Sequence, residues 1–165
     1  MSQPGQSVPA GRILVIGIGN EYRRDDAAGL IVVRRLSESS VGDFTVLEHT
    51  GDGAALMEAW KDAETVIVVD AVRSGAEPGT VHRFDSSLQP FPASTFRGST
   101  HTFSLVEAVE LSRTLSQLPP HFIVYGIEGR DFEAGSGLST EVEKAVPDVA
   151  DRVLHEVRAG SSRLF

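Results

Sequence analysis

The feature that most constrains the fold is a stretch near the N-terminus, residues 13–29, which reads ILVIGIGNEYRRDDAAG. Its first four residues, Ile13 to Ile16, form an unbroken apolar run, which is typical of a strand covered by helices on both faces. Gly17 and Gly19 then allow the backbone to turn tightly off the strand. A buried strand that leads through a turn into a helix predicts an α/β fold with its functional residues at the carboxyl edge of the sheet.

Two adjacent carboxylates, Asp25 and Asp26, open the helix that follows this turn. Either one is able to cap that helix, and capping or solvated charge is the ordinary role of aspartates at a helix start. A dinucleotide-binding loop is a second reading, but the third glycine of that fingerprint would fall at Tyr22. The apolar face of the helix recurs at i, i+3, i+4 and i+7. It comprises Gly29, Val32, Val33 and Leu36.

Strand and helix patterns alternate along the rest of the chain. Further strands are predicted at 44–48, 65–69, 79–84 and 122–127, the third of these antiparallel at an edge of the sheet. Helices are predicted at 54–61, after a capping box at Ser104 to Glu107, and from Ser139 or Thr140 onward. The helix after Ser104 has an apolar face of Leu105, Ala108, Leu111 and Leu115, and Pro147 should break the last helix before a segment that ends near Arg158.

These patterns predict one α/β domain, with a mostly parallel, mixed five-stranded sheet and helices on both faces. We assign residues 12–158 to the domain, and residues 1–11 and 159–165 to flexible tails.

Composition excludes several classes of function. Cysteine is absent, so disulfides, thiolate metal sites and cysteine nucleophiles are excluded. A net charge of -8 with scattered basic residues argues against a nucleic-acid partner. The first residues lack the basic start and apolar core of a signal peptide, and no apolar run reaches membrane-spanning length. We therefore expect a cytoplasmic protein without a membrane partner.

Three segments deliver possible metal ligands. Asp26 follows the first turn, Asp70 comes directly after the apolar run 65–69, and His101 precedes the helix with the capping box. A helix N-terminus favours neutral imidazole, the form that binds metals. A doubly wound sheet would gather the three side chains at one edge, where two carboxylates and an imidazole suit a divalent ion without selecting which one. His49, at the end of the second strand, is the histidine held in reserve.

The order and spacing of four motifs resemble those of the hydrogenase maturation proteases, which trim the C-terminus of nickel-containing hydrogenase large subunits. The motifs span about Ile13 to Pro147. They are Gly17-Ile18-Gly19-Asn20 with Asp25-Asp26 and Gly29, then Asp70-Ala71, Ser99-Thr100-His101, and Gly135-Ser136-Gly137-Leu138-Ser139. The chain departs from the family pattern at Glu48, where aspartate followed by two glycines is commoner, and at Gly129, where proline is frequent.

The resemblance implies an endopeptidase of aspartyl type that removes the C-terminal extension of a nickel-loaded large-subunit precursor. It implies that Asp26, Asp70 and His101 bind the nickel, which the precursor supplies, so that the site is empty until the substrate arrives. Asp26 and Asp70 are the catalytic candidates. Supporting or substrate-binding roles are implied for Gly17, Gly19, Asn20, Glu48 and His49.

Two alternatives remain open from the sequence: a nucleotide-binding Rossmann-like enzyme and a non-catalytic maturation chaperone. The sequence also leaves open which hydrogenase is processed, where it is cleaved, whether the metal is catalytic or only recognised, and the oligomeric state.

Overall fold

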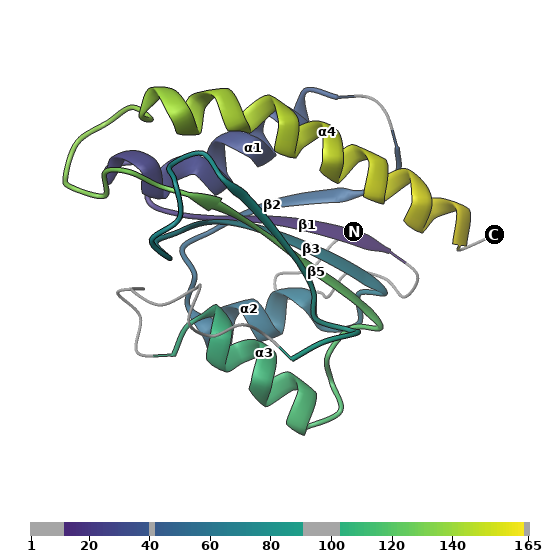
Figure 1. Ribbon diagram of the computed structural model, residues 1–165. Helices are drawn as coiled ribbons and strands as arrows, with labels where there is room; N and C mark the ends of the chain where they lie inside the picture. Colours follow the sequence, from purple (N-terminus) through teal and green to yellow (C-terminus); the bar gives the residue numbers. More distant parts are fainter. Residues whose placement is uncertain (1–11, 40–41, 91–102, 164–165) are drawn as a thin grey trace, which may run out of the picture.

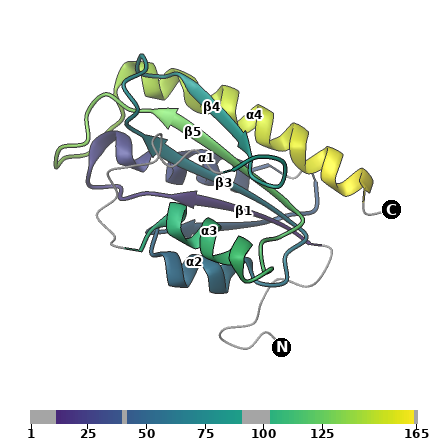
Figure 2. The ribbon, with the colours of Figure 1, turned by 60° about the horizontal axis from the view of Figure 1, so that its bottom comes forward.

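A five-stranded sheet lies between two helical layers in the computed structural model (Figure 1). The structure describes residues 12–39, 42–90 and 103–163. Helices α1 (Ala28–Ser37) and α4 (Thr140–Arg163) cover one face of the sheet. Helices α2 (Gly53–Trp60) and α3 (Leu105–Thr114) cover the other, as the turned view in Figure 2 also shows. The predicted three-layer α/β architecture is therefore confirmed.

The strands follow the order β2-β1-β3-β5-β4. Strands β2, β1, β3 and β5 run parallel, and β4 pairs antiparallel with β5 at the edge. The mixed, mostly parallel sheet with an antiparallel edge strand is thus as the sequence predicts. The strand bounds are Ile13–Ile18 for β1, Thr45–His49 for β2, Thr65–Val72 for β3, Val81–Asp85 for β4 and His121–Glu128 for β5.

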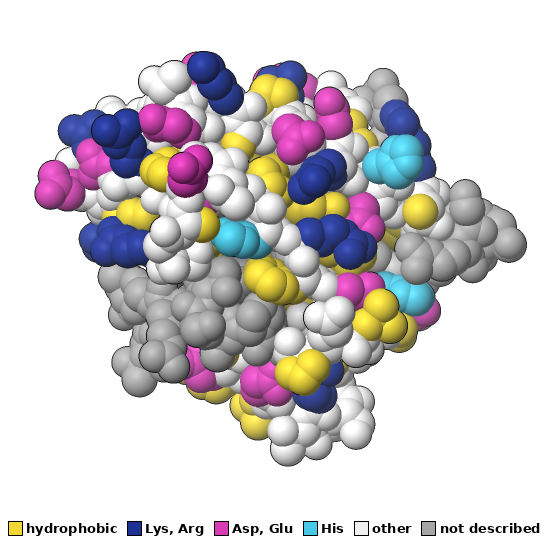
Figure 3. Space-filling view, in the orientation of Figure 1, with side chains coloured by type: hydrophobic (Ala, Val, Ile, Leu, Met, Phe, Trp, Pro, Cys, Tyr) yellow, Lys and Arg dark blue, Asp and Glu magenta, His cyan; other side chains and the backbone are white. Residues whose placement is uncertain are grey.

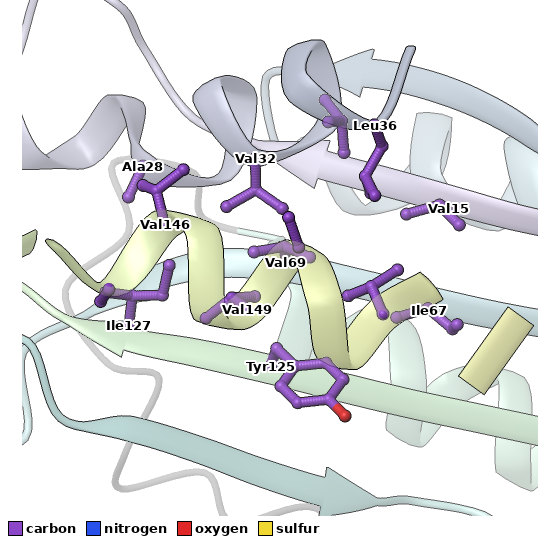
Figure 4. Packing of buried hydrophobic residues seen from close by; sticks show 14 of the residues in the cluster. Val15, Ala28, Val32, Leu36, Ile67, Val69, Tyr125, Ile127, Val146 and Val149 are labelled. Atoms are coloured by element: carbon purple, nitrogen blue, oxygen red, sulfur yellow. The ribbon is translucent and has the colours of Figure 1, made fainter. Parts of the chain in front are cut away.

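Buried side chains on both faces of β1 explain its continuous apolar run. Val15 points toward α1 and α4, where it joins Ile67, Val69 and Tyr125 from the neighbouring strands (Figure 4). Leu14 and Ile16 belong to the second cluster, between the sheet and helices α2 and α3. All six residues of β1 are buried, as expected for a central strand of an α/β sheet.

The last helix corrects one prediction, because α4 runs unbroken from Thr140 to Arg163 with Pro147 inside it. A proline within a helix removes one backbone hydrogen bond and crowds the preceding turn, at a cost of about 3 kcal/mol or more. A valine stripe on α4 packs along the sheet and offsets that cost. The stripe comprises Val142, Val146, Val149, Val153 and Val157. No helix in the described part of the chain combines the length and apolarity needed to span a bilayer.

Helix α3 presents a different face to the core from the one predicted. Its capping box is present: the Ser104 side chain accepts from the backbone N–H of Glu107, and the Glu107 carboxylate accepts from the backbone N–H of Ser104. Leu105 and Ala108 are buried as expected, but the face continues through Val109 and Ser112. Leu111 and Leu115 are 39% and 51% exposed. The predicted face was therefore wrong in its second half, where two leucines face outward.

Close contact between α1 and the sheet requires glycine at three positions. A Cβ on Gly29 would lie 2.3 Å from the carbonyl oxygen of Val69, and a Cβ on Gly17 would lie 2.3 Å from that of Gly29. A Cβ on Gly19 would lie 2.1 Å from the carbonyl oxygen of Asp26. Neither Gly17 nor Gly19 adopts positive φ. The need for glycine here comes from close approach of the backbone rather than from the tight turn that the sequence suggested.

Candidate functional site

The carboxyl edge of the sheet between β1 and β3 is where the candidate residues meet. After β1 the chain passes through a single 3₁₀ turn, η1 (Arg24–Ala27), into α1 on one side, whereas after β3 it leaves toward β4 on the other. Ligand sites of open α/β sheets lie at such a divergence. Asp26 stands on η1 and Asp70 in β3, and these two elements are in contact. Both side chains are half-buried.

The pKa values of both carboxyl groups are raised, and the charge of Asp26 contributes to the rise at Asp70. Burial raises the pKa of Asp26, and the hydrogen bond from Asn20 and the charge of Arg23 offset part of that rise. The pKa of Asp70 is raised well above its ordinary value, first by burial and then by the negative charge of Asp26, against one backbone hydrogen bond from Ala71. Like charges brought together in a partly dry site favour retention of a proton. This edge of the sheet therefore carries two neighbouring carboxyl groups that both retain their protons to higher pH than an ordinary aspartate.

Asp70 lies within a strand rather than after one. The sequence placed it directly beyond the apolar run 65–69, but β3 continues to Val72, and Asp70 is in register with Gly126 of β5. A glycine as strand neighbour leaves space beside the carboxyl group. The longer strand thus carries the carboxyl group on the sheet itself, which is a firmer support than a loop.

Asn20 shapes the loop between β1 and η1. Its backbone N–H donates to Asp26 Oδ2 at 2.9 Å, and its side-chain Oδ1 accepts from the N–H of Tyr22 at 2.9 Å. The N–H of Gly19 donates to the carbonyl oxygen of His49 at 3.0 Å. Asn20 is thus hydrogen-bonded to Asp26 and Gly19 joins the loop to the end of β2, and the supporting roles of both residues stay predictions.

Asp25 does not cap helix α1, as the sequence had suggested, but binds a distant segment of the chain. The N-cap of α1 is Ala27, with no side-chain hydrogen bond. The carboxylate of Asp25, which is 0% exposed, accepts hydrogen bonds from the segment between β5 and α4. Burial by itself opposes its ionisation, but the hydrogen bonds from Ser139, Arg130 and Asp131 outweigh that effect and lower its pKa. The partners lie 105 to 114 positions away, so local sequence could not reveal them.

Glu48 and His49 lie at the carboxyl end of β2. The exposed Glu48 pairs with Arg34 at 2.9 Å and 3.2 Å, and this hydrogen bond and charge lower the pKa of Glu48. His49 Nδ1 accepts from the N–H of Gly51 at 2.9 Å. Both residues border the site on the β2 side, and their supporting roles stay predictions.

His101 lies outside the described residues, so the predicted set of three ligands is not brought together within them. In the described ranges, no group of three or more histidine, aspartate or glutamate side chains is arranged to hold a metal ion. Asp26 and Asp70 supply two hard oxygen donors of the kind that divalent ions accept. The donor set thus fits a third ligand brought by another segment, and the ligand role of all three residues stays a prediction.

A second buried carboxylate was missed by the sequence analysis. Glu128 ends β5 and is 1% exposed. It accepts from the Ser74 hydroxyl at 2.5 Å and the Ser74 N–H at 2.8 Å, and its Oε1 lies 3.1 Å from His82 Nε2. Burial opposes its ionisation, and the bonds to Ser74, His82 and Gly75 lower its pKa overall. The signal was available, because a charge that directly follows an apolar run also marked Asp70.

A separate hollow of about 510 Å³ lies between β4, β5 and α4. Glu156, one of the residues that line it, is paired with Arg83 at 2.9 Å and accepts from the Tyr125 hydroxyl at 2.6 Å. On the face of the molecule that Figure 3 shows, acidic and basic side chains are intermixed. The hollow contains none of the predicted site residues, and the carboxyl edge remains the better candidate.

Comparisons with known proteins agree with the geometry. The family model described as hydrogenase maturation protease matches residues 31–156. The hydrogenase expression/formation protein HupD of Thiocapsa roseopersicina is 26% identical over 145 residues, a match covering 86% of this chain and 66% of that protein, slightly less than two thirds. The hydrogenase maturating endopeptidase HybD from E. coli superposes with a TM-score of 0.76 at 26% identity, covering 90% of this chain and 93% of that one. The [NiFe] hydrogenase maturation protease HybD from Thermococcus kodakarensis superposes with a TM-score of 0.71 at 25% identity, covering 88% of this chain and 99% of that one.

Proposed function

The chain belongs to the family of hydrogenase maturation proteases and is a peptide hydrolase, and on that premise we propose that it removes the C-terminal extension of a nickel-loaded hydrogenase large-subunit precursor. The observation that carries the proposal is the meeting of Asp26 and Asp70 at the divergence of β1 and β3, where the charge of one raises the pKa of the other. Cleavage of the precursor is what separates this proposal from a non-catalytic maturation chaperone.

The nickel belongs to the substrate in this proposal. Asp26 and Asp70 contribute carboxylate oxygens and His101 an imidazole nitrogen, a mixed donor set that accepts a first-row divalent ion. Bonds from such donors are about 2.0 to 2.2 Å long, as for zinc, so the three side chains must converge closely. Recognition of the loaded metal would restrict cleavage to precursors that have already received nickel.

Two routes to hydrolysis fit this arrangement. In the first, the precursor's nickel polarises the scissile carbonyl or activates the attacking water. In the second, nickel only docks the substrate, and Asp26 or Asp70 takes a proton from the attacking water and returns one to the leaving nitrogen. The raised pKa of Asp70 suits the second route, because a carboxyl group that retains its proton to higher pH is able to donate it.

The geometry also suits a protein substrate. Tyr22, 70% exposed, lies in the loop between Asn20 and Asp26, where its backbone is fixed on both sides. Its N–H donates to Asn20 Oδ1, and its carbonyl accepts from the N–H of Gly135 at 2.9 Å. An exposed aromatic side chain on a hydrogen-bonded loop that leads to Asp26 is a feature common at protein interfaces.

The test is cleavage of purified precursor in nickel-loaded and metal-free forms, followed by gel mobility of the large subunit. We expect the loaded form alone to be cleaved. His101→Ala should abolish cleavage or slow it at least ~100-fold, as expected for loss of one of three metal ligands, without loss of folding. His155→Ala, at an exposed position of α4, is the matched control and should cleave normally. Equal cleavage of both precursor forms would contradict nickel recognition, and normal cleavage by the His101 variant would direct attention to His49.

A further inference from the structure

We propose that Asp25 is a positioning residue for the site, because its carboxylate fastens the segment between β5 and α4 to the turn that carries Asp26. This inference rests on the proposed function for its consequence in catalysis. Its structural part, the fastening of one segment to the other, stands on the geometry alone.

The fastening consists of four hydrogen bonds to one buried carboxylate. Asp25 Oδ2 accepts from the N–H of Arg130 at 2.8 Å, the N–H of Asp131 at 2.9 Å and the hydroxyl of Ser139 at 2.9 Å, and Oδ1 accepts from the N–H of Ser139 at 2.7 Å. Hydrogen bonds to a charged acceptor contribute more to stability than bonds between neutral groups. With the side chain 0% exposed, water cannot replace these donors.

Backbone pairing adds to the attachment. The N–H of Asp25 donates to the carbonyl of Asp131 at 2.9 Å, the N–H of Arg24 to Gly135 at 3.1 Å, and the N–H of Gly135 to Tyr22 at 2.9 Å. Arg23 and Gly135 form an isolated parallel bridge. The segment 129–139 therefore lies along the turn over several residues, with the Asp25 carboxylate as the charged centre of the contact.

The η1 turn needs such support because it is short and irregular. It has four residues, no side-chain cap, and an N-cap residue, Arg23, at φ -129° and ψ 46°. Arg24 adopts φ 46°, in the left-handed region that a non-glycine residue seldom occupies. A single 3₁₀ turn gains too few hydrogen bonds to be stable in isolation. Its shape is therefore decided by the contacts that Asp25 and its neighbours make.

The position of Asp26 follows from that of Asp25. The two are adjacent, so their Cα atoms lie about 3.8 Å apart across one planar peptide. Asp25 points into the segment 129–139, while Asp26 accepts the N–H of Asn20 and acts electrostatically on Asp70. Loss of the fastening would release the turn, and a misplacement of about 1 Å at reacting groups is able to cost ~100-fold in rate.

Glu128 provides a matched control within the same chain. It too is a buried carboxylate that accepts several hydrogen bonds and holds a loop, in its case through Ser74 and Gly75 after β3. Among the described residues, the hydrogen bonds of its carboxylate go to Ser74, Gly75 and His82, and none goes to η1 or to Asp26. Loss of its charge should therefore destabilise the protein in a similar way without displacing Asp26.

The experiment compares Asp25→Asn with Glu128→Gln in the full-length protein. An amide keeps one acceptor oxygen but places an NH₂ donor where the carboxylate accepted from N–H groups. Asp25→Asn therefore disrupts the hydrogen bonds to the segment 129–139, and Glu128→Gln disrupts those to Ser74 and Gly75. We expect Asp25→Asn to lower kcat for nickel-loaded precursor by ~100-fold with KM nearly unchanged. Glu128→Gln should keep kcat within about threefold of the wild type, because its loop does not carry Asp26.

Amide hydrogen exchange measures the fastening directly and independently of cleavage. In the Asp25 variant, protection should be lost at Arg130, Asp131 and Ser139 and also at Asn20, whose N–H is bonded to Asp26. In the Glu128 variant, the loss should be confined to Ser74 and Gly75. Unchanged protection at Asn20 in the Asp25 variant would overturn the positioning role.

Further outcomes also decide the proposal. Equal losses of kcat in both variants would reduce Asp25 to general stability and overturn it. If Asp25→Asn fails to fold, Ser139→Ala, which removes only the hydroxyl bond, should lower kcat partially, and an unchanged kcat would count against the proposal. If the wild type cleaves no precursor, the proposed function fails, whereas the exchange pattern at Asn20 still supports or refutes the fastening.

Discussion

Substitution of Gly29 by alanine should separate helix α1 from the sheet. The Cβ of alanine would lie 2.3 Å from the carbonyl oxygen of Val69, 2.5 Å from that of Ile18 and 2.9 Å from the amide nitrogen of Ile18. All three atoms belong to the backbone of β1 and β3, so no side chain is able to move aside. Comfortable separations between heavy atoms are roughly 3.5 Å, so α1 would have to recede by about 1 Å.

The energetic cost follows from two opposing terms. Overpacking in a close-packed core costs about 1 to 3 kcal/mol, occasionally more, and contact with backbone on two strands places this site at the upper end. Alanine in place of glycine within a helix returns about 1 kcal/mol. We expect a net loss of about 2 kcal/mol or more, which corresponds to roughly 4 to 8 °C in Tm for a chain of this size.

Urea denaturation and calorimetry measure this loss, with Gly160→Ala as the control. Gly160 is also a buried helical glycine, but its added Cβ would meet the mobile end of Ile13, 3.1 Å away at Cδ1. That variant should be as stable as the wild type or more stable by up to about 1 kcal/mol. A Gly29 variant that matches the Gly160 variant in stability would refute the claim that close packing of α1 demands glycine. Because η1 leads into α1, cleavage should fall in the Gly29 variant as well.

Three other predictions concern charge and packing. Asp70→Asn should abolish cleavage yet stabilise the fold at pH 7 by about 0.5 to 2 kcal/mol, measured by urea titration. Because the pKa of Asp70 is raised in the folded state, its ionisation destabilises the fold as pH rises above the unfolded-state pKa. A variant less stable than the wild type at pH 7 would contradict this. The lowered pKa of Asp25 means that its charge stabilises the fold above the unfolded pKa of about 4 and that this contribution is lost as pH falls through the folded pKa. Asp25→Asn should therefore be less stable than the wild type at pH 7, and the difference should shrink as pH falls. A constant deficit across urea titrations at several pH values would disprove the role of the charge. Leu105→Ala should lower the free energy of unfolding by about 2 to 5 kcal/mol, whereas Leu111→Ala, at a 39% exposed position of the same helix, should lower it by less than about 1 kcal/mol. Similar losses in the two variants would show that α3 packs by the face that the sequence predicted.

The sequence by itself determined the fold class and the edge of the sheet at which the candidate residues Asp26 and Asp70 lie. Continuous apolar runs at 13–16 and 65–69 required strands covered on both faces, and helical spacing between them required crossover helices. From that alternation alone follows a mostly parallel sheet whose carboxyl edge receives Asp26 and Asp70. Local rules also sufficed for the capping box at Ser104, because both partners lie within one turn.

Only the tertiary structure decided the roles that depend on distant partners. Asp25 and Asp26 are alike in sequence, yet Asp25 is held by residues more than 100 positions away, whereas Asp26 accepts from the N–H of Asn20 and its charge acts on Asp70. The same holds for α4, in which a valine stripe against the sheet overrides the break that Pro147 would cause alone. Local patterns report what a segment prefers, whereas burial, hydrogen bonding and pKa depend on what the rest of the chain brings to it.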